Sequence, residues 1–140
     1  MIRRAAIDDL DSVYDIYSQR YDSNDADTIK YLKSDWEWYL KSDAAIVLVM
    51  EVDGEIVGLS FAYDMGLWGY LEHIVIREVH RKKGYAAMLI EHMLDIGKDL
   101  EWRVFEACYY EEIGEMANFF EHIGWEDGGI NTRWVYKNLN

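Results

Sequence analysis

Two apolar segments separated by Asp53-Gly54 constrain the fold of this chain more than any other feature of its sequence. Residues 44–52 and 55–63 are rich in aliphatic and β-branched side chains, which favour extended strands. An Asp-Gly pair between two such runs is a strong signal for a tight turn, because both residues tolerate the positive φ that a two-residue turn requires. The sequence therefore predicts a β-hairpin near the middle of the chain.

The rest of the sequence alternates between strand and helix patterns, with no internal repeat and no obvious linker. Apolar residues three and four positions apart predict helices, and short apolar runs predict strands. The expected order is strand 2–6, a helix from Asp8, a helix around 29–40, the hairpin, strand 70–76, a helix from about Gly84, strand 102–108, a helix around 113–123 ended by Gly124, and strand 132–137. This order predicts an α/β (α+β) fold, a mixed β-sheet flanked by helices, with a right-handed crossover between residues 70 and 108.

Length and composition predict one compact domain. The 140 residues are 51% hydrophobic and contain no proline, which fits a single domain spanning residues 1–140. The apolar runs are too short to cross a bilayer, and the opening residues lack the apolar stretch of a secretory signal. A single cysteine, Cys108, cannot form an internal disulfide, and we expect it to be a small core residue of a buried strand. A cytoplasmic protein is expected.

The formal net charge of −13 is large for a chain of this size. It disfavours binding to nucleic-acid phosphates, which most of the surface would repel. It is compatible with a charged surface that keeps the protein soluble, with a cationic substrate such as a polyamine or a lysine side chain, and with mimicry of a nucleic acid toward a basic partner. No His/Cys cluster has the spacing of metal ligands, so we expect no metal site.

One short segment reverses this acidic balance. Up to five cationic groups lie within seven residues, after an apolar strand and before a helix: Arg77, His80, Arg81, Lys82 and Lys83. Successive backbone N–H groups at such a turn, together with a helix N-terminus, form a concave anion site. Gly84 lets a phosphate approach the main chain without an intervening Cβ. The alternative is a solvated basic helix start, which the helix dipole opposes. The pattern therefore favours an anionic ligand.

These segments resemble the GNAT N-acetyltransferase family. Arg81-x-x-Gly84-x-Ala86 is similar to the Arg/Gln-x-x-Gly-x-Gly/Ala signature of that family, and residues 71–76 resemble its central strand. Residues 2–5, 52–58 and 117–125 resemble its opening, its hairpin and its common ending. The resemblance extends over nearly the whole chain and implies the GNAT fold, with six to seven strands in a mixed sheet and about four helices.

The resemblance also implies acetyl-coenzyme A as cosubstrate. In the family the pantetheine arm pairs with the central strand, here through Ile74, Val75 and Ile76. The implied contacts to the pyrophosphate and the rest of the cofactor are Arg81, Lys82, Lys83, Gly84, Tyr85, Ala86 and Ala87, with Phe120 packing against it. A neutral amine would attack the thioester carbonyl directly, and a backbone N–H of the central strand would stabilise the oxyanion.

Glu72 is the candidate base, because family members often carry a carboxylate at this position of the central strand. The alternative is that Glu72 only orients the substrate ammonium. Simple strand alternation places His73 on the opposite side, so that both cannot face one cleft, and we expect His73 to be packed. Trp36, Trp38 and Tyr39 exceed what one helix face can bury, and some of them are expected to line the acceptor site, which the N-terminal helices border in the family.

The general acid is where the sequence departs from the family. Phe120 stands where many members place a tyrosine, and Gly114 stands where an asparagine is common. Tyr109 and Tyr110 are the candidate replacements, unless the thiolate leaves without an acid.

The sequence therefore predicts an acetyl-CoA-dependent N-acetyltransferase acting on a small cationic amine or on a protein lysine or N-terminus. The alternative is a non-catalytic acidic protein on the same scaffold, a nucleic-acid mimic or inhibitor that binds a basic partner, with or without coenzyme A. A third hypothesis is a transferase that uses a longer acyl donor. We expect no nucleic-acid or membrane partner. A homodimer is compatible with the family, although no feature specifies an interface.

Overall fold

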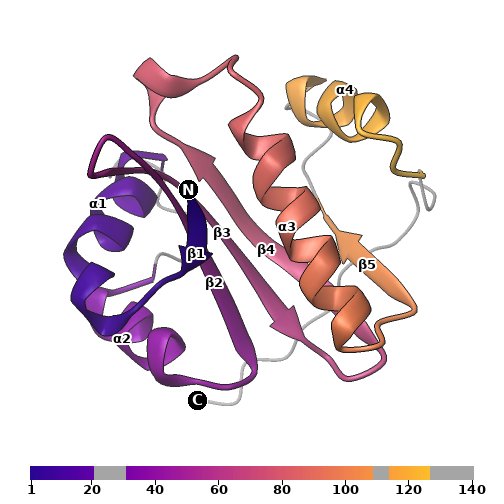
Figure 1. Cartoon of the computed structure of the whole chain (residues 1–140), viewed down its shortest axis with the longest axis horizontal. Coiled ribbons are helices and arrows are strands. Elements are labelled where there is room, and N and C mark those ends of the chain that lie inside the picture. The colour runs from indigo at the N-terminus through magenta and orange to yellow at the C-terminus, as the bar shows by residue number, and fades with distance from the viewer. Residues whose placement is uncertain (21–30, 109–113, 127–140) are drawn as a thin grey trace. The chain divides into compact units, whose positions relative to one another are not determined.

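The computed structural model describes residues 1–20, 31–108 and 114–126 (Figure 1). The elements are β1 (Ile2–Arg4), the short 3-10 turn η1 (Ile7–Asp9), α1 (Leu10–Arg20), α2 (Lys33–Lys41), β2 (Ala45–Val52), β3 (Glu55–Asp64), β4 (Trp68–Ile76), the 3-10 turn η2 (Glu78–His80), α3 (Tyr85–Asp99), β5 (Val104–Ala107) and α4 (Gly114–His122). Residues 1–108 form one compact unit, and α4 belongs to a second. The expected single domain stays a prediction, and the expected strand 132–137 lies outside the described residues.

The strands of the first unit form one mixed sheet in the order β1-β2-β3-β4-β5. Neighbours from β1 to β4 are antiparallel, whereas β5 runs parallel to β4 after the connection through α3. The central hairpin has the predicted turn, since Val52 pairs with Glu55, and Asp53 and Gly54 have φ values of 52° and 80°. The predicted hairpin and the mixed sheet are therefore confirmed.

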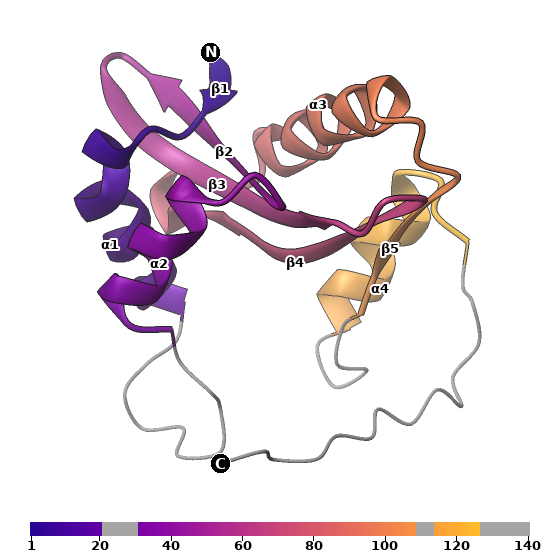
Figure 2. The same ribbon diagram turned by 90° about the horizontal axis from the view of Figure 1, so that it is seen from below.

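Helices cover both faces of this sheet (Figure 2). The pair α1 and α2 lies on one face and α3 on the other. The spacing of the apolar residues explains this, because α3 buries Leu89, Ile90 and Met93 along one side. The opposite core joins helix to strand residues: Val13, Ile16, Tyr17 and Trp36 pack with Val47, Leu59, Phe61 and Val75. Burial of each aliphatic side chain contributes about 1.5–3 kcal/mol, which favours the packing of helices on both faces of the sheet.

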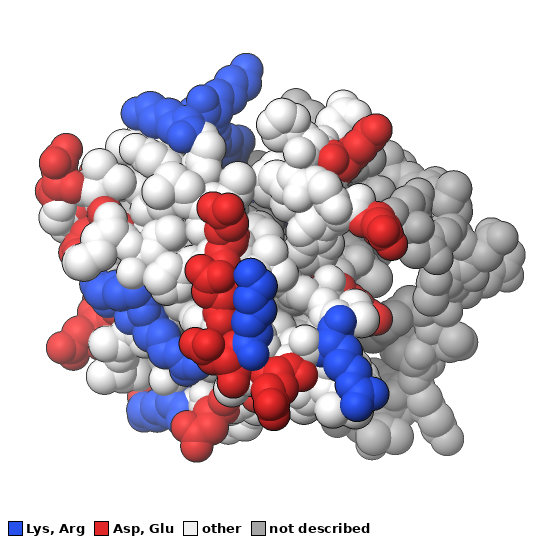
Figure 3. Space-filling view, turned by 45° about the vertical axis from the view of Figure 1, so that its right-hand side comes forward, with Lys and Arg blue, Asp and Glu red and all other residues white. Residues whose placement is uncertain are grey.

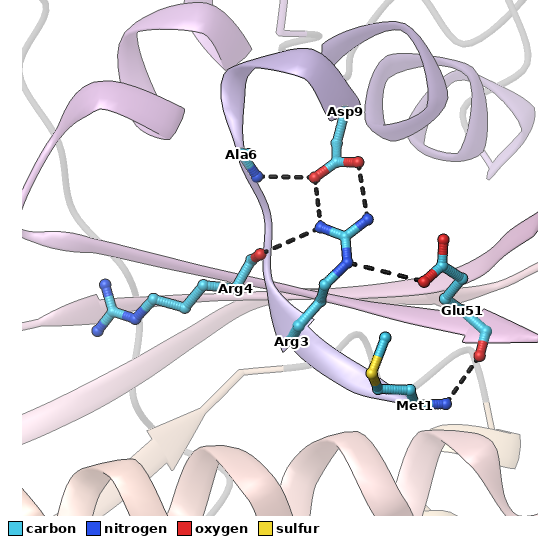
Figure 4. A network of polar contacts seen from close by, with 6 residues as sticks. All are labelled: Met1, Arg3, Arg4, Ala6, Asp9 and Glu51. Atoms are coloured by element: carbon cyan, nitrogen blue, oxygen red, sulfur yellow. Dashed lines mark hydrogen bonds and ion pairs between the residues drawn. The ribbon is translucent and has the colours of Figure 1, made fainter. Parts of the chain in front are cut away.

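The N-terminus is fixed by a polar network (Figure 4). The Arg3 guanidinium donates two hydrogen bonds to the Asp9 carboxylate, at 2.7 and 3.0 Å, and the same carboxylate accepts from the Ala6 N–H at 2.7 Å. The Met1 ammonium donates to the Glu51 carbonyl at 2.8 Å. The Arg3 hydrogen bond lowers the pKa of Asp9. Strand β1 is thus tied both to β2 and to the turn that starts α1.

Trp102 fixes the other end of the crossover. Its indole ring lies against Gly69 of β4 and Gly97 of α3, and a Cβ at either glycine would overlap the ring. The indole Nε1 donates to Asp64 Oδ1 at 2.9 Å. Only glycine lets strand and helix approach the same ring this closely, so Trp102 sets the separation of α3 from β4.

Two expectations about single side chains have different outcomes. Cys108 is exposed, so its placement in a buried strand is wrong. The reason is that β5 is the last strand of the described sheet, and its residues are alternately exposed and half-buried. The expectation that α2 cannot bury all its aromatics is confirmed, since Trp36 is fully buried while Trp38 is 64% exposed.

Candidate functional site

Strand β4 has one edge that is only partly paired. It pairs with β3 along its length, whereas β5 pairs only with Trp68–Leu71. The Arg77 N–H donates to the Val57 carbonyl at 2.8 Å, and hydrogen-bonded pairs alternate in an antiparallel ladder. The main-chain groups of Ile74 and Ile76 therefore point away from β3, to an edge that no strand of the described residues occupies. We call this stretch, Ile74–Ile76, the open edge.

The open edge presents its main chain, and its Ile74 and Ile76 carbonyls accept hydrogen bonds from arginine side chains. The side chains of Ile74, Val75 and Ile76 are all buried in the sheet. An extended ligand with its own amide groups can pair with such an edge in the way that another strand would.

The chain then leads from the open edge to the start of α3. The Arg81 Nε donates to the Ile76 carbonyl at 3.0 Å, which ties the turn to the end of β4. Lys82 and Gly84 have positive φ values of 62° and 80°. Gly84 is the N-cap of α3, which has no side-chain cap and no acidic residue in its first turn. A Cβ at Gly84 would meet nothing within 4 Å, so an anion can approach the N–H groups of Tyr85, Ala86 and Ala87.

The charge around this turn is positive. Lys82 and Lys83 are exposed beside Gly84, and in Figure 3 Lys and Arg side chains gather at the upper edge, where Figure 1 draws the segment between β4 and α3. Arg77 serves another purpose, because its guanidinium donates to Asp15 of α1 at 2.8 Å and to the Ile56 carbonyl at 3.0 Å. Fewer cationic residues of this turn are therefore placed to attract an anion than the sequence pattern indicates.

Glu72 lies at a β-bulge immediately before the open edge. His73 pairs with Phe61 and Leu71 pairs with Ala62, so Glu72 is the extra residue of β4. Glu72 Oε1 accepts a hydrogen bond from the Tyr31 hydroxyl at 3.2 Å, and the His73 ring packs 5.3 Å from the Tyr31 ring. Both side chains therefore reach the same aromatic residue. The expectation that they face opposite sides is wrong, because the bulge interrupts the alternation on which it rests.

The surroundings of Glu72 suit a group that accepts a proton. Its side chain is 29% exposed, and burial raises its pKa, although the hydrogen bond from Tyr31 opposes part of this effect. His73 Nε2 lies 4.0 Å from Glu72 Oε1. Burial and the positive charge of Arg20 lower the pKa of His73 to about 4, so the imidazole is neutral at neutral pH. His73 is packed among aromatic rings, as expected.

Three tyrosine hydroxyls form a chain of hydrogen bonds that begins at Glu72. Tyr31 and Tyr63 hydroxyls are 3.2 Å apart, and Tyr63 donates to Tyr39 at 3.1 Å. Burial raises the pKa of both Tyr31 and Tyr63, so both stay protonated. Tyr39 was among the aromatics expected near the acceptor. Tyr31 and Tyr63 were missed, because only the packing of α2 against the sheet brings them to Glu72.

Several predicted site residues cannot be placed beside β4. Tyr109 and Tyr110 lie outside the described residues. Phe120 lies in α4, where its ring packs against Phe119 and Trp125 at 5.4 and 5.0 Å, and its cofactor contact stays a prediction. Within the described ranges there is no group of His, Cys, Asp and Glu side chains that could hold a metal ion. No helix in the described part of the chain is long and apolar enough to span a membrane.

Comparison with known proteins shows the family to which the chain belongs. Residues 10–125 match the model of the Acetyltransferase (GNAT) family. The chain is 33% identical over 116 residues to an uncharacterized N-acetyltransferase of Archaeoglobus fulgidus, covering 75% of this chain and 78% of that protein. It is 26% identical to an uncharacterized N-acetyltransferase of Methanocaldococcus jannaschii, covering 96% of this chain but only 64% of the length of that relative.

Solved structures show the same fold. The aminoglycoside N-acetyltransferase AAC(6')-Iy, in complex with a CoA bisubstrate analogue, superposes with a TM-score of 0.82 at 19% identity, covering 99% of this chain and 98% of that one. A ribosomal-protein-alanine N-acetyltransferase from Brucella melitensis biovar Abortus 2308 superposes with a TM-score of 0.79 at 22% identity, with 98% of both chains covered. From the family match and the fold together, the chain is a member of the GNAT family of acetyltransferases.

Proposed function

We propose that this protein is an acetyl-CoA-dependent N-acetyltransferase in which a primary amine attacks the thioester directly. The observation that carries the proposal is the path from the Glu72 carboxylate along the open edge to the uncapped, basic start of α3. The acceptor is a small cationic amine or the lysine or N-terminus of a protein. The related folds include proteins named for both classes, an aminoglycoside acetyltransferase and a ribosomal-protein-alanine acetyltransferase.

The residues present fit acetyl-CoA. The main chain of Ile74–Ile76 would pair with the pantetheine arm, and the N–H groups from Lys82 to Ala87 would hold the pyrophosphate. Two features support this fit: no Cβ blocks Gly84, and the first turn of α3 has no side chain acting as a competing cap. The positive charge of Arg81, Lys82 and Lys83 adds attraction for an anion in an otherwise acidic protein.

The chemistry required of the side chains is proton transfer and orientation. Acetyl-CoA supplies the acyl group, and the attacking amine must lose a proton. Glu72 takes that proton, directly or through a water, and its raised pKa brings it closer to the working pH. Its other role, attraction of the substrate ammonium, requires the same ionised carboxylate. Activity is therefore expected to fall on acidification through the pKa of Glu72.

Calorimetric titration with acetyl-CoA tests the cofactor site. Gly84→Glu is matched by Gly54→Glu, because both glycines have φ of 80° and neither has an atom within 4 Å of a built Cβ. The two variants thus introduce the same backbone strain and the same charge. We expect Gly84→Glu to weaken binding by more than about tenfold and Gly54→Glu to leave it unchanged. Equal affinity in both variants would exclude this turn as the phosphate site.

A thiol-release assay over a panel of polyamines, aminoglycosides and lysine peptides tests the reaction. We expect Glu72→Gln to lower kcat about 10²- to 10⁴-fold on any amine that is acetylated, and to remove the acidic limb of the pH profile. Glu91→Gln, on the exposed side of α3, is the control. A Glu72→Gln enzyme with the wild-type profile at every pH would remove Glu72 as the base. Binding of acetyl-CoA without turnover of any amine would favour the non-catalytic alternative.

A further inference from the structure

The C-terminal end of α1 places a guanidinium group at the open edge. Arg20 is the last residue of α1, and its Nη1 donates to the Ile74 carbonyl at 2.9 Å. That carbonyl belongs to the stretch of β4 whose main-chain groups point away from β3. Ile74 follows Glu72 by two positions, so Arg20 bonds to β4 two residues along the strand from the proposed base.

The charge of Arg20 acts on the groups around Glu72. Together with burial, its positive charge lowers the pKa of His73, whose Nε2 is 4.0 Å from Glu72 Oε1. The other guanidinium on the open edge, that of Arg81, lies at the Ile76 carbonyl, next to the phosphate end of the proposed site. Arg20 therefore places a positive charge at the Glu72 end of the open edge, where Glu72 is proposed to accept the proton of the amine.

The polar side chains around Glu72 do not suit a second proton transfer. The lowered pKa of His73 keeps its imidazole neutral near neutral pH, so it is not an imidazolium that could act as an acid. Burial raises the pKa of Tyr31 and Tyr63, which makes both hydroxyls weaker acids, and their hydrogen bonds run to each other and to Glu72. Arg20 differs from these neighbours because its guanidinium carries a positive charge.

We propose that Arg20 is a catalytic residue whose guanidinium stabilises the thiolate released by acetyl transfer. The inference depends on the proposed function. The amine lone pair forms the new C–N bond, the C–S bond breaks with its electron pair remaining on sulfur, and the amine proton passes to Glu72. A nearby cation makes protonation of the sulfur unnecessary, because an opposite charge within about 4–6 Å lowers the pKa of an acid by about 1–3 units. Arg20 thus takes the place of the tyrosine that many family members carry where this chain has Phe120.

The test measures the thiol pKa of bound coenzyme A, from its thiolate absorbance with the protein in excess. A free thiol has a pKa of about 8.5. We expect wild-type protein to lower this pKa by at least about 1 unit, Arg20→Lys to keep part of the shift, and Arg20→Gln to abolish it. Arg4→Gln is the matched control, since Arg4 is an exposed arginine on β1 at the opposite edge of the sheet. In turnover, Arg20→Gln should lower kcat about 10- to 100-fold, with little change in KM for acetyl-CoA.

The outcomes separate this inference from the proposed function. If coenzyme A binds to wild type and to Arg20→Gln with the same thiol pKa, Arg20 only ties α1 to β4 and the inference is overturned. A lower melting temperature of Arg20→Gln with an unchanged thiol pKa leads to the same conclusion. If wild-type protein does not bind coenzyme A, both the proposed function and the inference fail.

Discussion

The close packing of the Trp102 ring predicts whether a methyl group added at Gly97 stabilises or destabilises the protein. We consider Gly97→Ala, in the interior of α3. In a solvent-exposed helix this substitution stabilises by about 1 kcal/mol, because alanine has the higher helix propensity. Here the added Cβ would overlap the indole ring, with the atoms Cδ2 and Cζ3 also only 3.0 Å away.

The ring has little freedom to move away. Gly69 of β4 lies against it as well, and its Nε1 is held by Asp64 at 2.9 Å. Overpacking of this kind typically costs about 1–3 kcal/mol. Loss of a hydrogen bond to a carboxylate would add about 1.5–3 kcal/mol if the ring rotated. After subtraction of the gain in propensity, we expect Gly97→Ala to destabilise the protein by up to about 2 kcal/mol, or by about 1.5–5 kcal/mol if the ring also rotates, a fall of several degrees in Tm.

Urea unfolding followed by circular dichroism measures this change, and the Trp102→Leu background is its control. Without the indole ring, the new methyl group has space, so Gly97→Ala should become neutral or stabilising by up to about 1 kcal/mol. The double-mutant cycle therefore predicts a change of sign. If Gly97→Ala stabilises the wild-type protein, or destabilises both backgrounds equally, the ring does not pack against this glycine as described.

Three further predictions concern single side chains. The buried neutral His73 has a pKa lowered from 6.5 to about 4, so the unfolded chain binds more protons between these values, and acidification through this window should remove up to about 3 kcal/mol of stability; His73→Phe, followed by urea unfolding at pH 7 and 4.5, should flatten that dependence. Asp9 has a lowered pKa beside Arg3, so its contribution is present above the pKa of the unfolded chain and lost as pH falls through the folded value; Asp9→Asn should destabilise by about 1 kcal/mol at pH 7, and this difference should vanish in strong acid. Glu101 follows the end of α3 with φ of 63°, and the Trp102 N–H donates to the Gly97 carbonyl at 2.9 Å; Glu101→Gly should raise Tm by relieving up to about 1 kcal/mol of strain, whereas Lys98→Gly inside the helix should lower it.

The elements of the fold were predictable because their signals are local. Asp53-Gly54 fixes a turn by its own backbone preferences, and the spacing of Leu89, Ile90 and Met93 specifies a buried helix face. Cys108 shows the limit of this reasoning. An apolar pattern predicts a strand, but burial depends on whether another layer covers it, and no local signal carries that information.

The sequence pattern predicted the main-chain turn of the candidate site, and the family resemblance supplied Glu72. The turn at Gly84 has a local signature, since a basic segment and a glycine precede a helix. The cluster of Tyr31, Tyr63 and Glu72 joins three segments that are far apart in sequence, and so does the contact from Arg20 to Ile74. Such contacts follow from strand register and helix packing, which a residue pattern does not specify.

The bulge at Glu72 connects the two halves of the site. Pairing of β4 with β5 ends at Leu71, the residue before the bulge, and the open edge begins just beyond it. An extra residue in one strand interrupts the ladder and increases its local twist. The same insertion therefore directs Glu72 toward Tyr31 on the α1 and α2 side and accompanies the loss of a neighbour for Ile74 and Ile76. A regular strand would place Glu72 and His73 on opposite faces. The position of a single extra residue thus places the proposed base next to the main-chain edge proposed for the cosubstrate.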